Sequence, residues 1–370
     1  MTARAGTHRI PISELKRLHR HVWLPNLKIP LFYGLLVAAG IGAWTTPSPV
    51  LRWVLYAAMG YLWMGIVTFM HDCTHNTLFE KRWKNWAFGI FSMIPLLVTF
   101  VSFKDDHLAH HRYNRSPRDP DAFTMGRRGF LDFVLFYAYI LIGGLLTVVQ
   151  FTVIYPFQHF DRRRWLIHGA ELLLRVAVIG GLLVLSARHD VLGRVLAIWL
   201  IPAFLFTLLN SVRFLAEHYE TPWDEGQLLG TRTIVSNRVN RFFWNNINYH
   251  IGHHVHPGVP WYNLKKLHLA LRPELAAAGA VVDASYLAVF LGACARGPET
   301  IERNAHHQAA RHRGDGARSG QGASIAPWRR AAEGGVGGDG DSSGGVCATR
   351  PPLSESAPRP DSSTGAGSYS

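Results

Sequence analysis

Six long apolar runs constrain how this chain can fold more than any other feature of the sequence. They lie at residues 29–44, 50–70, 86–103, 130–157, 166–187 and 191–215. An α-helix needs about 20 apolar residues to cross about 30 Å of hydrocarbon, so runs of this length are typical of membrane helices. They are not expected in the core of a fully soluble protein. We therefore predict an all-α membrane protein.

Positive charge is concentrated beside these runs and predicts their orientation. The chain carries 38 Lys and Arg against 25 Asp and Glu, a net charge of +13. Basic segments at 16–20, 81–84, 112–128 and 162–164 flank the apolar runs, and such segments mark cytoplasmic loops. They do not form one basic stripe with interleaved aromatic residues, so the charge does not indicate a nucleic-acid partner. We expect these segments to face the cytoplasm.

The positions of the basic segments also predict which runs cross the membrane. The first two runs form one hairpin, and the last two form a second. The runs between them, 86–103 and 130–157, begin and end beside cytoplasmic segments, so we expect interfacial or re-entrant helices there. The prediction is four transmembrane helices in two hairpins, with both termini and a histidine-rich cap in the cytoplasm. We expect an integral protein of the cytoplasmic (inner) membrane.

Composition divides the chain into three parts. We predict a cytosolic N-terminal segment at 1–28, a membrane domain at 29–295 and a disordered tail rich in Gly, Ser and Arg at 296–370. No cleaved signal peptide is evident. The three cysteines are scattered without pairing or metal-ligand spacing, which argues against a disulfide scaffold. Within the third predicted span, Glu171 and Arg175 are four residues apart and can pair on one helical face.

Eight of the 20 histidines form three short motifs. The motifs are HxxxH (His71 and His75), HxxHH (His107, His110 and His111) and a second HxxHH (His250, His253 and His254). Residues three and four apart project from the same face of a helix, so each motif can direct its imidazoles to a common point. The topology predicted from charge alone places all three motifs on the cytoplasmic side.

Eight imidazoles are too many for one zinc ion, which takes four ligands in a structural site. They suit two transition-metal ions, and iron is the redox-active candidate. His218 follows the last apolar run on the same side and can complete the set. A lone histidine is more often a satisfied core residue than a ligand, but three motifs of matched spacing favour a metal centre. Candidate carboxylates for orienting the imidazoles are Asp72, Asp105, Asp106 and Asp121.

The motifs HDCTH, HLAHH and HIGHH resemble those of the membrane fatty acid desaturase and hydroxylase superfamily. The stretch 231–269, with RFFWNNINYH and HPGVPWY, is similar to its bacterial acyl-chain desaturase branch, and the RDPD loop at 118–121 fits as well. The resemblance covers residues 15–272. It implies a non-haem di-iron centre on the cytosolic face, molecular oxygen as co-substrate and electrons from a separate ferredoxin-like carrier. The eight motif histidines match the iron ligands of the family, and His218 matches an additional one.

The sequence departs from the family pattern beside His218. Some members carry an asparagine four residues before this histidine, where the present chain has Phe214. Asn210 and Asn246 are alternatives, and Glu217 resembles the pattern of alkane hydroxylase relatives. We assign no catalytic residue beyond the metal ligands, and no cofactor other than the two iron ions.

Three functions follow from these observations. The favoured one is oxygen-dependent desaturation of a lipid acyl chain. The alternative is a hydroxylase, ketolase or monooxygenase that acts on an alkane, terpenoid or carotenoid with the same site. A membrane metal carrier is the third, and it requires polar residues in the middle of spans. Because the histidines lie at the ends of the predicted spans instead, transport is disfavoured.

Overall fold

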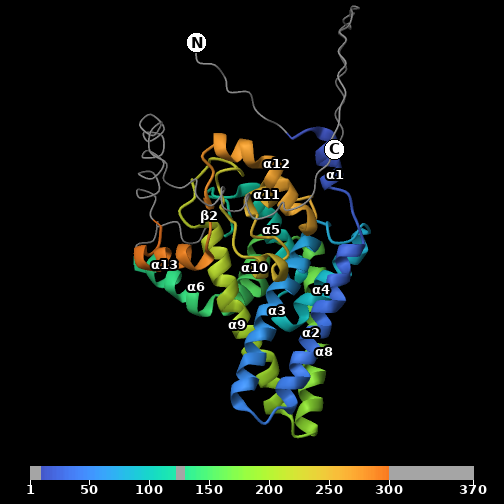
Figure 1. The fold of residues 1–370 in the computed structure, drawn as a ribbon. Coiled ribbons are helices and arrows are strands. Elements are labelled where there is room, and N and C mark those ends of the chain that lie inside the picture. Colours follow the sequence, from blue (N-terminus) through green and yellow to red (C-terminus); the bar gives the residue numbers. More distant parts are fainter. Residues whose placement is uncertain (1–9, 122–129, 300–370) are drawn as a thin grey trace, which may run out of the picture. The chain divides into compact units, whose positions relative to one another are not determined.

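The computed structural model describes residues 10–121 and 130–299, all of them within the first of two compact units, Met1–Pro327. Most of the tail predicted to be disordered, from residue 300 onward, lies outside the described residues, as does the beginning of the N-terminal segment. The described part is mostly helical, in agreement with the predicted fold class (Figure 1).

The elements follow one another along the chain with short connections. They are α1 (Ile12–Leu18), η1 (Leu24–Leu27), α2 (Lys28–Thr45), α3 (Pro49–Thr74), α4 (Arg82–Met93), η2 (Ile94–Leu96), α5 (Phe100–Tyr113), α6 (Phe130–Val149), η3 (Gln150–Ile154), α7 (Tyr155–His159), α8 (Arg162–Arg188), α9 (Leu192–His218), β1 (Thr233–Ile234), α10 (Arg238–Phe243), α11 (His250–Val255), η4 (Trp261–Asn263), α12 (Leu264–Ala277), β2 (Val282–Asp283) and α13 (Tyr286–Arg296). The two short strands pair in parallel.

The two predicted hairpins are present as pairs of long helices. Helices α2 and α3 pack against each other, as do α8 and α9, and α9 also packs along α3. Side-chain caps define where these helices begin: Ser48 accepts a hydrogen bond from Leu51 N in α3, and Asp161 accepts one from Arg164 N in α8. Apolar side chains such as Leu173 and Val176 point outward from α8, 71% and 70% exposed, as expected for a helix in contact with lipid.

The number of candidate spans is larger than the four predicted. Within the described residues, five helices are long and apolar enough to cross a membrane: Leu24–Thr45, Pro49–Thr74, Phe130–His159, Arg162–Arg188 and Leu192–His218. The predicted count of four is therefore not confirmed, because the segment from α6 to α7 is also long and apolar enough to cross a membrane. This segment is irregular, with a break in helical geometry at Ile142 and a π-helical turn in η3. The cytoplasmic orientation remains a prediction.

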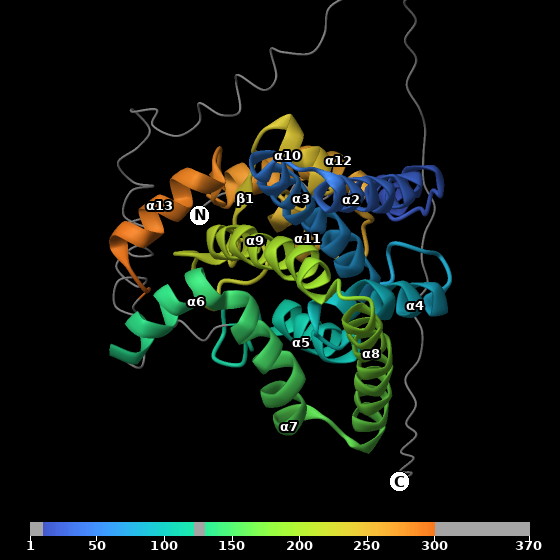
Figure 2. The same ribbon diagram turned by 90° about the horizontal axis from the view of Figure 1, so that it is seen from below.

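The apolar run at 86–103 is broken into two helical parts. Such a break is expected for a segment that does not cross the membrane as one straight helix. Its two helical parts, Arg82–Leu96 and Phe100–Tyr113, meet at an angle of 105°. Figure 2 shows α6, α7 and α8 arranged around α5, which follows this break. Leu97 lies at the bend with a left-handed backbone (φ 63°). The bend directs α5 towards the end of α3, where the first histidine motif lies.

Buried charges stabilise the helix ends at this bend. The predicted pair of Glu171 and Arg175 forms, with 3.5 Å between Arg175 Nη2 and Glu171 Oε2. Both carboxylate oxygens of Glu171 also accept hydrogen bonds from the first amides of α5, Phe100 N (2.6 Å) and Val101 N (3.1 Å). Amides at a helix N-terminus have no partner within the helix, and the helix dipole favours an anion there. Glu171 therefore fixes the start of the helix that carries the second histidine motif.

Lys104 stabilises the C-terminal end of α3, as Glu171 stabilises the N-terminal end of α5. Its buried ammonium group donates to the carbonyl oxygen of Thr74 and lies 3.5 Å from that of Cys73. Carbonyls at a helix C-terminus also lack partners within the helix, and a cation complements the dipole there. The charge of Lys104 therefore links α5 to the end of α3 directly beside the first histidine motif.

We predict that Glu171→Ala destabilises the protein by about 3–5 kcal/mol, because it leaves Arg175 buried without its carboxylate and the first amides of α5 without acceptors. Thermal unfolding in detergent, followed by tryptophan fluorescence, measures the change. Leu173→Ala, at an exposed position of the same helix, is the control and should have little effect. Equal unfolding temperatures for the two variants would contradict the role assigned to Glu171.

Candidate metal centre

The histidine motifs lie at the ends of four helices. His71 is in the last turn of α3, and His75 is the residue that ends this helix. The second motif occupies the last turns of α5, the third forms most of the short helix α11, and His218 is the last residue of α9. Figure 1 shows α5 and α11 at the same end of the molecule, away from the turn between α2 and α3. The fold thus brings all nine predicted histidines together.

Five of the nine histidines form a first cluster. One ring nitrogen from each lies within 4.8 Å of those of the others, and the five are His71, His75, His107, His111 and His253. The shortest separations join residues far apart in sequence. His75 Nε2 is 2.9 Å from His107 Nε2, and His111 Nε2 is 3.0 Å from His253 Nε2.

The remaining four histidines form a second cluster beside the first. His110, His218 and His254 have ring nitrogens within 4.8 Å of one another. His250 joins them, because its Nε2 is 3.1 Å from Nε2 of both His218 and His254. The clusters touch where the rings of His111 and His254 stack, with centroids 4.2 Å apart.

The expectation that each motif points to a single centre is wrong for the two HxxHH motifs. Each contributes its residues four apart to one cluster and the remaining residue to the other. Thus His107 and His111 face the first cluster while His110 faces the second, and His253 separates from His250 and His254 in the same way. Successive residues of a helix point about 100° apart, so adjacent histidines diverge while residues four apart stay together.

Burial keeps most of these imidazoles neutral, but His110 is an exception: its desolvation is outweighed by Asp119 and Asp121, which raise its pKa. Desolvation lowers the pKa of His250, His253 and His254 well below its usual range, and neighbouring imidazoles lower it further. The pKa of His75 is lowered in the same way, by burial first and by His111 next. A neutral imidazole keeps a free lone pair on one ring nitrogen, which is the form that binds metal.

The spacing of the ring nitrogens fits bound metal ions. Ligand nitrogens about 2.1 Å from an ion are separated by about 3 Å at right angles and about 4.2 Å when opposite each other. The shortest observed separations, 2.9–3.1 Å, match the value at right angles, and the upper limit of 4.8 Å on the others is slightly longer than the value for opposite ligands. Direct contact between Nε2 atoms allows only one nitrogen of each pair to be protonated, so lone pairs converge in both clusters. A cation in each would satisfy them.

Carboxylates next to the clusters orient some of the rings. Asp119 accepts a hydrogen bond from His110 Nδ1 (2.9 Å) and another from Arg115 N (2.8 Å), which fixes the ring of His110. Sequence reasoning missed Asp119, although it belongs to the RDPD loop. Of the four carboxylates it proposed, Asp121 lies 3.5 Å from the same ring nitrogen and Asp72 lies 3.8 Å from His71 Nδ1.

The other two proposed carboxylates have different surroundings. Asp105 pairs with Arg164 at 3.1 Å and accepts a hydrogen bond from Tyr155. Asp106 is buried, and its Oδ1 has no hydrogen-bond partner among the residues at 10–121 and 130–299.

Gln227 is a second residue of the site that the sequence did not reveal. Its Oε1 lies 3.0 Å from His254 Nδ1, and its amide nitrogen donates to the carbonyl of His111. It therefore holds α11 to α5 at the junction of the two clusters. No motif marks this residue, because it lies in the loop after α9, far in sequence from both partners.

Glu217, next to His218, is entirely buried beside the second cluster. Its Oε2 is 2.8 Å from Arg213 Nη1 and 3.6 Å from His250 Nε2, and its Oε1 accepts a hydrogen bond from Tyr286. The two asparagines considered from the sequence have other contacts. Asn210 accepts hydrogen bonds from Arg213, and Asn246 donates to Trp261 O.

An apolar cavity of about 250 Å³ lies beside the first cluster, between α3, η2, α6 and α9. Its lining includes Met70, the residue before His71, and Phe103, whose ring is parallel to that of His107 at 5.6 Å. Along α9 the lining runs from Trp199 to Ser211, about 18 Å at the rise of an α-helix. The cavity thus connects the histidines to the part of the protein formed by the apolar helices.

The fold and the site together define a helical membrane protein with a histidine-rich candidate metal centre beside an apolar cavity. A sequence model of the fatty acid desaturase family matches residues 45–286, and the chain belongs to this family. It is accordingly an oxidoreductase of lipid metabolism.

Curated relatives agree with this assignment. The sn-1 oleoyl-lipid 12-desaturase of a Picosynechococcus strain is 25% identical over 267 residues, which cover 66% of this chain and 75% of the relative. The Delta(12)-fatty-acid desaturase of Arabidopsis thaliana is 25% identical over 264 residues (62% and 68%). A sphingolipid delta(4)-desaturase/C4-monooxygenase of Mus musculus is 25% identical over 252 residues (62% and 70%).

We predict that Asp119→Asn weakens metal binding at the second cluster about 10–100-fold, because the ring of His110 loses its charged acceptor. Titration with Co²⁺, followed by its visible absorption, measures the affinity. Asp105→Asn is the matched control, since Asp105 pairs with Arg164 rather than with an imidazole of the clusters. If both variants bind Co²⁺ like the wild type, Asp119 does not support the metal site.

Proposed function

We propose that the nine histidines hold two iron ions and that the protein desaturates a lipid acyl chain, with molecular oxygen as the oxidant. The observation that carries this proposal is the pair of adjacent imidazole clusters at the end of an apolar cavity. Five and four imidazole nitrogen ligands suit two transition-metal ions with positions left open for a further ligand. Membership of the desaturase family supports iron as the metal.

When bound, the iron pair supplies the oxidising power needed to break an unactivated C–H bond, which side chains of ordinary pKa cannot provide. The overall reaction balances with two external electrons. Oxygen accepts four electrons: two come from the adjacent C–H bonds of the substrate, and two from an external carrier. With two protons added, the products are one carbon–carbon double bond and two molecules of water. We propose a ferredoxin-like protein as the carrier.

The protein itself contributes by positioning the substrate relative to the clusters. The apolar cavity receives part of an alkyl chain and excludes water from it, while the parallel rings of Phe103 and His107 place its wall directly beside the first cluster. Which methylenes react depends on which ones rest beside the clusters. Close packing of α6 against α9 keeps the cavity narrow: a Cβ atom on Gly144 would lie 2.1 Å from Thr207 Cγ2. We infer that the distance from the clusters to the far end of the cavity, near Trp199, selects the reacting carbons.

The same site also supports hydroxylation, the second function considered from the sequence. The name of the mouse relative joins a desaturase and a monooxygenase activity in one protein. Transfer of oxygen to the substrate, instead of removal of a second hydrogen, requires no change in the histidine ligands. An alkane, terpenoid or carotenoid fits the apolar cavity as an acyl chain does. We favour the acyl chain because two of the three relatives above are named as lipid or fatty-acid 12-desaturases.

We further propose that the protein lies in the cytoplasmic membrane with the clusters facing the cytoplasm. The exposed basic residues Lys81, Lys84, Arg162 and Arg163 lie at the ends of apolar helices nearest the clusters, which supports this orientation by the positive-inside rule. A cytoplasmic centre is also accessible to a soluble electron carrier.

Mass spectrometry of total lipids tests the proposed reaction. The host should express the protein together with a ferredoxin and its reductase, with His110→Ala as the inactive control. We expect acyl chains lighter by two hydrogen atoms in the wild type alone. Chains heavier by one oxygen atom would favour the hydroxylase instead. Unchanged lipids in cells that contain iron-loaded protein would contradict an acyl-lipid substrate.

A further inference from the structure

Helix α1 is fixed against the segment that follows α11. Asn263 Nδ2 donates to Leu18 O (2.8 Å), and Val22 N donates to the hydroxyl of Tyr262 (2.7 Å). The rings of His19 and His256 meet edge to face, with centroids 6.3 Å apart. Helix α1 therefore packs at the same end of the protein as the histidine clusters.

Positive side chains gather where these two segments meet. Five of them are exposed and define what we term the basic surface: Lys16, Arg17, Arg20, Lys265 and Lys266. Lys265 and Lys266 follow Asn263, the residue that contacts Leu18, so they lie in the first turn of α12 beside α1. Glu14 is the acidic residue in this part of α1, and it pairs with Arg17 at 3.4 Å.

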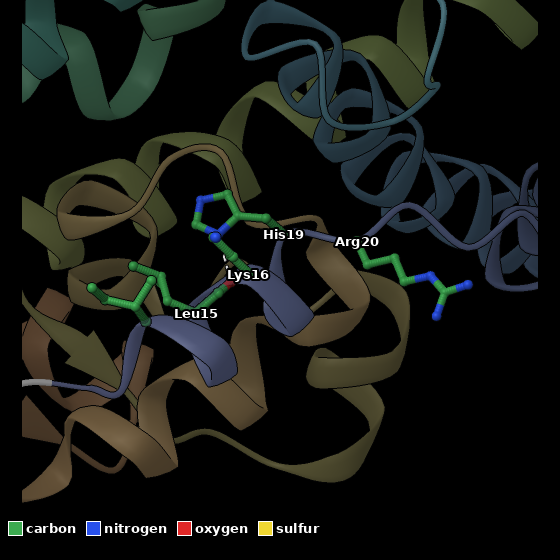
Figure 3. Close-up of a pocket in the computed structure, with 5 residues that line it drawn as sticks. Leu15, Lys16, His19 and Arg20 are labelled. Atoms are coloured by element: carbon green, nitrogen blue, oxygen red, sulfur yellow. Dashed lines mark hydrogen bonds between the residues drawn. The ribbon is translucent and has the colours of Figure 1, made fainter.

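The part of the basic surface on α1 is open to solvent and only slightly hollowed. A shallow depression there is lined by Ile12, Leu15, Lys16, His19 and Arg20. Figure 3 shows the ring of His19 turned back over α1 towards Leu15, to whose carbonyl oxygen it is hydrogen-bonded, while Arg20 extends away from it. Ile12, which is 73% exposed, and Leu15 lie beside the positive charges of this open face. Such a face can receive an acidic part of another protein.

The segment beneath this surface is connected to both histidine clusters. Trp261 N donates to Asp72 Oδ2 (3.0 Å), and Asp72 directly follows His71 of the first cluster in the sequence. His256, in contact with His19, lies two residues after His254 of the second cluster. The segment 256–261 therefore lies between the basic surface and the two clusters. One hydrogen bond, one ring contact and a few covalent bonds connect the basic surface through it to one candidate ligand in each cluster.

We propose that the basic surface is the docking site of an acidic, soluble one-electron carrier of the iron–sulfur type, and that electrons enter through residues 256–261. This inference rests on the proposed function, which requires two external electrons for each double bond. At each encounter the carrier is oxidised by one electron and the metal centre is reduced by one. Two encounters complete a cycle, and the protein itself forms or breaks no bond.

Charge and position favour a soluble partner over a lipid surface. Figure 1 shows α1 at the end of the molecule that holds α11 and α12, whereas α2 runs towards the opposite end. The exposed apolar residues suited to the membrane boundary, Val22 and Trp23, come after the basic residues of α1 and shortly before α2. Opposite charge steers a soluble partner to such a surface and raises its association rate.

The test compares two double charge reversals in the full-length, iron-loaded protein, held in nanodiscs of zwitterionic phosphatidylcholine. Lys16→Glu/Arg20→Glu alters the basic surface. Arg163→Glu/Arg238→Glu is the matched control, with the same change in charge at exposed positions outside it. The probe is a plant-type [2Fe–2S] ferredoxin. Its Kd is measured at several salt concentrations, and reduction by dithionite checks that the metal centre is unchanged.

We expect the surface variant to raise the Kd for ferredoxin at least about tenfold and to flatten its salt dependence, with less than about a twofold change in the control. Both variants should be reduced by dithionite as the wild type is. Equal Kd values in the surface variant and the control would overturn the proposal. A difference that appears only in nanodiscs with anionic lipid would also overturn it, and would assign the surface to the membrane.

Lipid analysis separates this inference from the proposed function. If the wild type makes desaturated lipid and the surface variant supports the same ferredoxin-dependent rate, the docking site is wrong and the function stands. If the wild type binds ferredoxin through the basic surface but makes no desaturated lipid, the docking site stands and the proposed reaction is wrong.

Discussion

The whole structure depends on burying nine imidazoles where apolar helices end. Polar groups in such surroundings are costly unless each one finds a partner, and charged ones are more costly still. Burial therefore keeps the rings of the third motif neutral, and their ring nitrogens converge on one another instead of on water. The same requirement explains the buried charges nearby. Glu171 satisfies the start of α5 and Lys104 the end of α3, so the two helices meet at a defined distance.

This arrangement turns a simple helical repeat into two adjacent clusters of imidazoles. Residues four apart stay in one cluster, and the residue between them joins the other, so α5 and α11 each contribute to both. A helix that serves two clusters holds them at a fixed separation. Asp119 and Gln227 add to this rigidity, because each holds a ring nitrogen of the second cluster from the side opposite the converging nitrogens. Two ions in rigid, adjacent positions suit chemistry that needs both.

Much of this site could be predicted from the sequence, because local patterns encode it. Histidines three and four apart, apolar runs and a Glu–Arg pair four apart all report on one helix at a time, and the structure contains each of them. The 100° step of a helix already separates His110 from His111 and His253 from His254. That the two directions lead to two separate clusters depends on how α5 and α11 pack, which no local spacing contains. Gln227 could not be predicted for the same reason, because its contacts also depend on how distant segments pack. The number of spans also could not be settled, because the segment from α6 to α7 is apolar enough to cross whether or not it does.

Anomalous X-ray diffraction at the iron absorption edge, on crystals of the iron-loaded protein, tests the central claim most directly. The account predicts two separate anomalous peaks. One should lie among the ring nitrogens of His71, His75, His107, His111 and His253, and the other among those of His110, His218, His250 and His254. A single peak shared by all nine histidines would contradict the division into two clusters. Peaks absent at the iron edge but present at the zinc edge would contradict the proposed oxidative chemistry.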